Sequence, residues 1–207
     1  MNFLLCHGWG FDSSFWQNLT PLLAPHTVYT VDLGYFGNPK PFPTSGTWIG
    51  IGHSLGLIKL LQTRLTFSAL IGLNSFLNFL GPFSLHERRE KELLKMIQSF
   101  EKDPEKTLAS FYKMCGVDFQ VTRDHINKAL LLNDLKSLFV DYSELLPPIP
   151  CLSLESKNDI IVPLECGLGH YPKVTQPILE EGRHGLGFLY PLEVKAQVTA
   201  YLLSQKA

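Results

Sequence analysis

Short apolar runs alternate with helical patterns along most of the chain. Continuous apolar runs bounded by turn residues predict strands that are buried on both faces of a parallel sheet. We expect such strands at residues 2–7, 27–32, 47–52, 68–74, 151–155 and 173–182. Helical patterns follow Asp12 and Ser54, and a last helix begins at Pro191. This alternation predicts an α/β fold with a doubly wound, mostly parallel sheet.

Residues 76–146 break this rhythm with helical patterns that carry much of the charge. Apolar residues recur every three or four positions in two stripes: Leu93, Leu94, Ile97 and Phe100, then Leu108, Phe111, Tyr112 and Cys115. Asp103 and Gly116 are typical residues for the start and end of the second helix. We interpret the segment as a small helical cap inserted into one domain that spans residues 1–207.

The composition suits a single folded domain that binds neither nucleic acid nor a membrane. The chain has 207 residues, of which 45% are hydrophobic and 18% charged, and its net charge is −1. That charge gives no basis for non-specific nucleic-acid binding. No apolar run is long enough to span a bilayer, and the beginning, MNFLLCHGWG, does not read as a signal peptide.

The spacing of cysteines and histidines argues against a metal or another cofactor. Four cysteines lie far apart without a C-x-x-C pair: Cys6, Cys115, Cys151 and Cys166. We expect them to be reduced and mostly buried in a cytoplasmic protein. None of the seven histidines pairs with another ligand at a convincing helical spacing.

The glycine-rich turn TWIGIGHSLG, residues 47–56, fits two functions. A dinucleotide-binding turn, G-x-G-x-x-G, would need glycine at position 55, where the chain has Leu55. Such a turn is also expected near the first strand. The alternative is a nucleophile turn, G-x-S-x-G, in which Ser54 is flanked by Gly52 and Gly56. We favour this second reading.

A reactive serine needs a base and an acid, which in this order of motifs follow it along the chain. His184 comes directly after the last predicted strand and would take the serine proton. Asp159 follows the strand at 151–155, although Glu155 and Asp32 are rival acids. A simpler reading makes Ser54 a helix cap and Asp159 and His184 loop residues.

Two backbone donors are needed for the oxyanion that forms during acyl transfer. The N–H of Leu55, at the start of the helix, is one candidate. HGWG, residues 7–10, resembles an oxyanion loop, and the N–H of Trp9 is the second candidate. We expect His7 to brace this loop and His53 to take no part in proton transfer.

These motifs resemble those of the α/β-hydrolases, and most of all the pimeloyl-ACP methyl ester carboxylesterases of biotin synthesis. The matching pieces are LLCHGWGFDSSFW, VDLGYFG, WIGIGHSLG, FEKDPEKTLASFYKMCG, LLLNDLKSLF, PCLSLESKNDIIVP and RHGLGFLYPLEV. The family pattern D-x-x-V-P favours Asp159 as the acid. Relative to that family, the chain starts at what is usually the third strand, so the N-terminal hairpin is missing. The cap is shorter between Gly116 and Leu130, and Ser156 replaces a usual glycine.

The resemblance implies a serine esterase that removes the methyl group from a pimeloyl chain on acyl carrier protein. It also implies that the acyl pocket is lined by Trp9, Leu55 and the cap residues Phe111, Tyr112 and Cys115. Cations of the cap would dock the acidic carrier protein, and the candidates are Arg88, Arg89, Lys91 and Lys95.

Three other functions stay open at this point. The first is a general short-chain esterase or thioesterase. The second is a lyase similar to the one in menaquinone synthesis, whose polyanionic substrate calls for arginines near the pocket. Outside the cap the chain offers mainly Arg64 and Arg183. The third is a binding protein without catalysis, against which the complete set of reactive residues argues.

Overall fold

A computed structural model describes residues 1–119, 125–172 and 174–205 of the chain. The strands are β1 Asn2–Cys6, β2 Thr27–Val31, β3 Thr47–His53, β4 Thr66–Leu73, β5 Cys151–Ser156, β6 Val174–Thr175 and β7 Ile178–Leu179. The α-helices are α1 Leu55–Leu61, α2 Phe83–Lys102, α3 Pro104–Cys115, α4 Lys128–Ser137, α5 Leu186–Leu189 and α6 Pro191–Ser204. None of the helices in these described stretches is long and apolar enough to cross a membrane.

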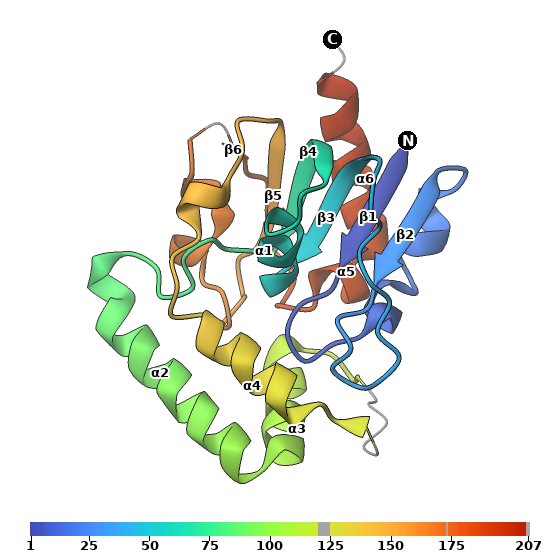
Figure 1. Cartoon of the computed structure of the whole chain (residues 1–207). Helices are drawn as coiled ribbons and strands as arrows, with labels where there is room; N and C mark the ends of the chain where they lie inside the picture. Colours follow the sequence, from blue (N-terminus) through green and yellow to red (C-terminus); the bar gives the residue numbers. More distant parts are fainter. Residues whose placement is uncertain (120–124, 173, 206–207) are drawn as a thin grey trace.

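The strands form one parallel sheet in the order β2-β1-β3-β4-β5-β6, and β7 also pairs with β5. Parallel strands bring their carboxyl ends to one edge of the sheet. In Figure 1 the arrowheads of β1, β2 and β3 point toward the cap helices, which lie below that edge. The cap therefore faces the residues that directly follow the strands, where ligands bind in open α/β sheets.

The two faces of the sheet are covered by different helices. Leu4 and Cys6 of β1 pack in one buried cluster with Leu60 of α1. Their neighbours Phe3 and Leu5 point to the other face, in the large cluster that also contains Val194 and Val198 of α6. Since successive strand residues point to opposite faces, a strand buried on both faces must be apolar throughout. The predicted α/β class with a doubly wound parallel sheet is confirmed.

The cap consists of α2, α3 and α4, which lie between β4 and β5 in the chain. The side chain of Asp103 accepts a hydrogen bond from the Lys106 N–H and starts α3, and Gly116 ends it at φ 76°. The whole predicted stripe of α3 is buried. In α2, Leu94 is 43% exposed, whereas Leu93 is 2% exposed. A straight helix gives adjacent residues different directions, so only one of this pair faces the core.

Two predicted elements differ in form. In each case a proline, which supplies no backbone N–H donor, lies within the predicted element. The helix predicted after Asp12 is two short 3₁₀ helices, η1 Ser13–Trp16 and η2 Thr20–Leu23, with Pro21 in the second. The strand predicted at 173–182 is divided into β6 and β7, with Pro177 between them. Lys173, at the start of that prediction, lies outside the described residues.

Candidate active site

Ser54 occupies a sharp turn between β3 and α1. Its backbone has φ 53° and ψ −125°, a conformation that L side chains rarely adopt. The turn is held in place by the Ser54 N–H, which donates to the Leu73 carbonyl at 3.0 Å. Ser54 is the N-cap residue of α1, yet its side chain makes no capping hydrogen bond. A serine that serves only as a helix cap accepts a hydrogen bond from the first turn of the helix through its hydroxyl. The Ser54 hydroxyl does not, so capping does not explain the strained backbone.

The flanking glycines make this turn possible. A Cβ on Gly52 would lie 2.4 Å from the backbone N of Leu57, and a Cβ on Gly56 would lie 2.2 Å from the carbonyl oxygen of Cys6. Both distances are far below contact distance. Gly50, two residues before the turn, instead faces the side chains of Phe67 and Leu70, so its role is packing within the sheet.

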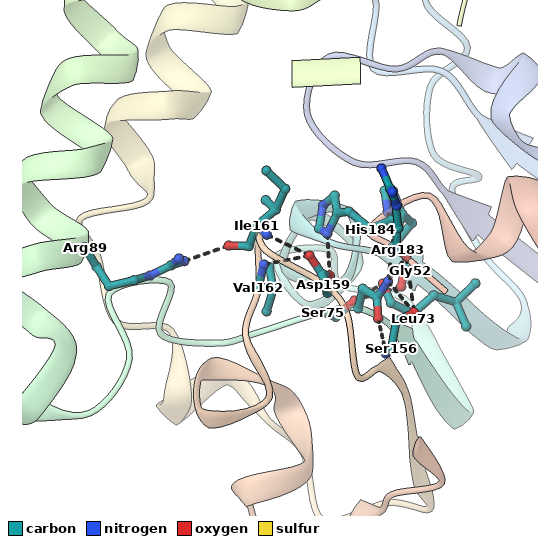
Figure 2. Close-up of polar contacts among 12 residues, drawn as sticks. Gly52, Leu73, Ser75, Arg89, Ser156, Asp159, Ile161, Val162, Arg183 and His184 are labelled. Atoms are coloured by element: carbon teal, nitrogen blue, oxygen red, sulfur yellow. Dashed lines mark hydrogen bonds and ion pairs between the residues drawn. The ribbon is translucent and has the colours of Figure 1, made fainter. Parts of the chain in front are cut away.

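Asp159 and His184 come together at the carboxyl edge of the sheet. His184 Nδ1 donates to Asp159 Oδ2 at 2.8 Å, and both side chains are fully buried. Figure 2 shows the other oxygen of the carboxylate at the N–H groups of Ile161 and Val162. Three donors therefore fix Asp159. Since Nδ1 carries the proton, Nε2 of neutral His184 is left with its lone pair.

The two rival acids are engaged elsewhere. Glu155 points away from this pair and accepts hydrogen bonds from Ser153, from the Gly169 N–H and from Gln176. Asp32 accepts from the N–H groups of Ser13 and Gly34. Neither carboxylate makes a hydrogen bond to His184.

His184 lies beside the strained turn. Its ring centroid is 4.8 Å from that of His53, the residue before Ser54, and its carbonyl oxygen accepts from His53 Nε2 at 2.8 Å. His184 Nε2 is buried and has no hydrogen-bond partner among the described residues. An unbonded buried nitrogen has an energetic cost. In an enzyme without bound substrate, the hydrogen bond between the base and the nucleophile is often long, and it tightens only when the substrate binds.

Asn74 braces the segment that carries His184, and no motif in the sequence pointed to it. It follows β4 at φ 46° and is 1% exposed. Its Nδ2 donates to the carbonyl oxygens of Arg183 and His184, and its Oδ1 accepts from the Ser156 N–H at 2.8 Å. The Ser156 hydroxyl fills the space between Asn74 and the Arg183 carbonyl. The feature of the sequence that could have pointed to Asn74 is an asparagine directly after a strand, because asparagine tolerates the left-handed backbone conformation.

The HGWG loop packs directly on the turn. A Cβ on Gly8 would lie 3.0 Å from Cβ of Ser54, so only glycine allows this approach. His7 braces the loop: its Nδ1 donates to the Gly8 carbonyl at 2.9 Å and its Nε2 accepts from the Leu33 N–H at 3.0 Å. The indole of Trp9 is fixed by its donation to the carbonyl of Leu131 in α4, at 2.8 Å.

The cap residues predicted to line the acyl pocket gather near His184. Phe111 lies edge-on to Trp9 at 5.0 Å and 6.2 Å from the His184 ring. The Tyr112 hydroxyl instead donates to the Gly10 carbonyl and so braces the HGWG loop. Burial raises the pKa of the Cys115 thiol well above its usual range, which keeps this thiol neutral and unreactive.

The four cations predicted to dock a carrier protein have different surroundings. Arg88 and Lys91 are exposed on α2 and pair with Glu92 and Glu87. Lys95 is exposed and lines a groove of about 720 Å³ between α2 and α3.

The prediction that Arg89 offers a surface charge is wrong. Arg89 is 3% exposed, and its guanidinium donates to the carbonyls of Phe79 and Ile161. Its position on the helix points it inward, where backbone carbonyls replace water as partners.

Two buried histidines are expected to make the fold acid-sensitive. Burial lowers the pKa of His7 and, more strongly, that of His53 from 6.5. Below about pH 6.5 these histidines bind protons in the unfolded chain but not in the folded one, so the free energy of unfolding decreases as the pH falls. The expected slope is about 1.4 kcal/mol per pH unit for each histidine. Urea unfolding between about pH 7.5 and 5.5 measures it.

The matched variants for this slope are His53→Asn and His86→Gln. His86 is exposed on α2, so its replacement should leave the slope unchanged, whereas His53→Asn should flatten it. Equal slopes in both variants and in the wild type would contradict a neutral buried His53.

Among the described residues, no three His, Cys, Asp or Glu side chains gather as metal ligands would. The polar groups of the site are instead one hydroxyl, one imidazole, one carboxylate and the N–H groups of a loop and a helix start. Such a set is typical of nucleophilic acyl transfer.

In sequence, the chain is similar to known proteins over only part of its length. No protein-family model matches the chain. The chain is 27% identical over 132 residues to the pimeloyl-[acyl-carrier protein] methyl ester esterases of Legionella pneumophila strains Lens and Corby. This match covers 55% of the chain and 54% of each relative, so the chain spans about half the length of the curated relatives it matches.

Solved structures match over nearly the whole chain. An esterase from Exiguobacterium antarcticum has a TM-score of 0.79 at 14% identity, covering 97% of this chain and 91% of that one. A bromoperoxidase from Bacillus anthracis has a TM-score of 0.78 at 19% identity, with the same coverages of 97% and 91%. A hydrolase from Oleispira antarctica has a TM-score of 0.78 at 16% identity, covering 98% and 90%. The protein therefore has the α/β-hydrolase fold with a small helical cap, and part of its sequence is similar to pimeloyl-[acyl-carrier protein] methyl ester esterases.

Proposed function

We propose that the protein is a serine carboxylesterase whose substrate is the methyl ester of pimeloyl-acyl carrier protein. One observation carries the esterase proposal. A buried imidazole is oriented by a carboxylate, its second nitrogen is unbonded, and it lies beside a strained turn whose serine hydroxyl caps no helix. The substrate itself is proposed from the resemblance to the Legionella relatives.

In this proposal His184 Nε2 takes the proton of the Ser54 hydroxyl as Ser54 Oγ attacks the ester carbonyl. The N–H groups of Trp9 and Leu55 hold the oxyanion of the tetrahedral intermediate. The proton on His184 then passes to the methoxy oxygen, and methanol leaves. A water molecule, deprotonated by His184, attacks the acyl-enzyme, which releases the acid and restores Ser54.

The groove between α2 and α3 is the proposed docking surface for the carrier protein. Its cations include Arg88, Lys95, Lys102 and Lys106, against the acids Glu92 and Asp103. An excess of positive charge favours encounter with an acidic carrier protein. The proposed setting is the cytoplasm, whose reducing conditions would preserve the four buried free thiols.

The decisive experiment incubates the purified protein with methyl pimeloyl-acyl carrier protein and follows the free acid by mass spectrometry. We expect demethylation by the wild type and none by Ser54→Ala. Arg88→Glu combined with Lys95→Glu should raise KM for this substrate but leave hydrolysis of p-nitrophenyl butyrate unchanged. The matched control is Lys195→Glu, a charge reversal at an exposed position on α6.

The alternatives predict other results. Rapid cleavage of p-nitrophenyl butyrate without demethylation would indicate a general short-chain esterase or thioesterase. Turnover of neither ester, with no labelling of Ser54 by a fluorophosphonate, would reject the esterase proposal. In that case the lyase and the binding protein would remain.

A further inference from the structure

Arg89 on the cap helix α2 and Asp159 in the proposed active site are connected through one peptide group. Arg89 Nη2 donates to the Ile161 carbonyl oxygen at 2.9 Å. The same peptide unit carries the N–H of Val162, which donates to Asp159 Oδ1 at 3.0 Å. Asp159 Oδ2 in turn accepts from His184 Nδ1. Figure 2 shows this chain of hydrogen bonds from the guanidinium to the imidazole.

We infer that Arg89 is a positioning residue, which holds Asp159 in the orientation that directs His184. This inference rests on the proposed serine-esterase function. A positive guanidinium at the oxygen of a peptide group polarises that group and strengthens the donor at its other end. The donor here is the Val162 N–H, so Arg89 stabilises the charged carboxylate without touching it.

The surroundings of Arg89 fit a fixed position. Its guanidinium also donates to the Phe79 carbonyl, through Nε at 3.2 Å and Nη2 at 3.0 Å, and lies 4.3 Å from the centroid of the Phe79 ring. Burial lowers the pKa of this guanidinium, and the charge of Asp159 is among those that oppose the shift. A buried arginine of this kind is costly unless its partners are well placed.

The same contacts connect the cap to the reacting groups. Phe79 lies in the segment between β4 and α2, and Ile161 lies in the loop after β5 that carries Asp159. Arg89 joins both segments to α2. A shift of α2 would therefore move the Ile161–Val162 peptide, and with it one of the two N–H groups that bind Asp159 Oδ1.

The test replaces Arg89 with methionine, which keeps part of the apolar stem but has no hydrogen-bond donor. For p-nitrophenyl butyrate we expect kcat to fall by about 10- to 100-fold, with KM nearly unchanged, because the geometry of the reacting groups is altered while the pocket is not. Arg89→Lys keeps the positive charge but replaces the planar guanidinium by a single ammonium group, so it should retain part of kcat. Arg64→Met is the matched control and should behave like the wild type, because Arg64 is exposed between α1 and β4, outside the cap and the site.

A double-mutant cycle separates positioning from general loss of structure. In the Asp159→Asn background, Arg89→Met should change kcat by less than about 2-fold, since the carboxylate it acts upon is absent. The same proportional loss in both backgrounds would overturn the inference. If Arg89→Met does not fold, Arg89→Lys enters the cycle in its place, with the same two outcomes.

A second readout does not require turnover. The proton between His184 Nδ1 and Asp159 should give a far-downfield proton NMR signal that is absent in Asp159→Asn. We expect this signal to shift or broaden in Arg89→Met and to stay in place in Arg64→Met. An unchanged signal in folded Arg89→Met would overturn the inference. A wild type that shows the signal but hydrolyses no ester would instead contradict the proposed function.

Discussion

Replacement of Ser54 by alanine is expected to lower kcat for p-nitrophenyl butyrate by roughly 10⁵- to 10⁶-fold. The variant loses the only oxygen nucleophile on the strained turn, while the polar groups around it are retained. His184→Ala should cost about as much. The double variant should be no worse than either, because the two groups act as one unit. Steady-state kinetics with active-site titration by a fluorophosphonate measures these effects.

Ser68→Ala is the matched control, since Ser68 is exposed on β4, outside the site. It should retain wild-type activity and fluorophosphonate labelling. A Ser54→Ala protein with more than about one hundredth of the wild-type kcat would exclude Ser54 as the nucleophile, because the non-covalent groups alone leave far less activity. Losses that multiply in the double variant would show that Ser54 and His184 act independently.

The largest effect on stability is expected from Gly56→Ala. The added Cβ would lie 2.2 Å from the Cys6 carbonyl oxygen and 2.6 Å from that of His7. Both atoms belong to the backbone of β1 and the loop that follows it, so neither can move aside without disturbing the sheet. We expect a loss of about 3 kcal/mol or more in the free energy of unfolding, measured by urea denaturation.

Gly50→Ala is the control from the same stretch of sequence. Its Cβ would meet the ends of the Phe67 and Leu70 side chains at 2.9 and 3.0 Å. Side chains can rotate, so the expected cost is about 1 kcal/mol. Equal losses in the two variants would show that helix α1 is free to move away from β1. A Gly56→Ala protein that does not fold beside a folded Gly50→Ala protein would agree with the prediction.

The fold could be predicted in most of its parts because the signals are local. Apolar runs of strand length and capping residues such as Asp103 and Gly116 act over a few residues, and they located the strands and the helix α3. The form of two elements was predicted wrongly, and a proline lies within each of them, Pro21 in the first and Pro177 in the second. It was also wrong for Arg89, because periodicity alone did not show that this arginine would find two backbone carbonyls inside the protein.

The sequence by itself determined the α/β class, the cap between β4 and β5, and the steric need for glycine on both sides of Ser54. These follow from periodicity and from the geometry of a turn, both of which depend on residues that are close together in the chain. Only the tertiary structure decided that Asp159, rather than Glu155 or Asp32, binds His184, and that Asn74 and Arg89 brace this pair. Such contacts join segments far apart in the chain, and they depend on which strand ends lie side by side in the folded sheet.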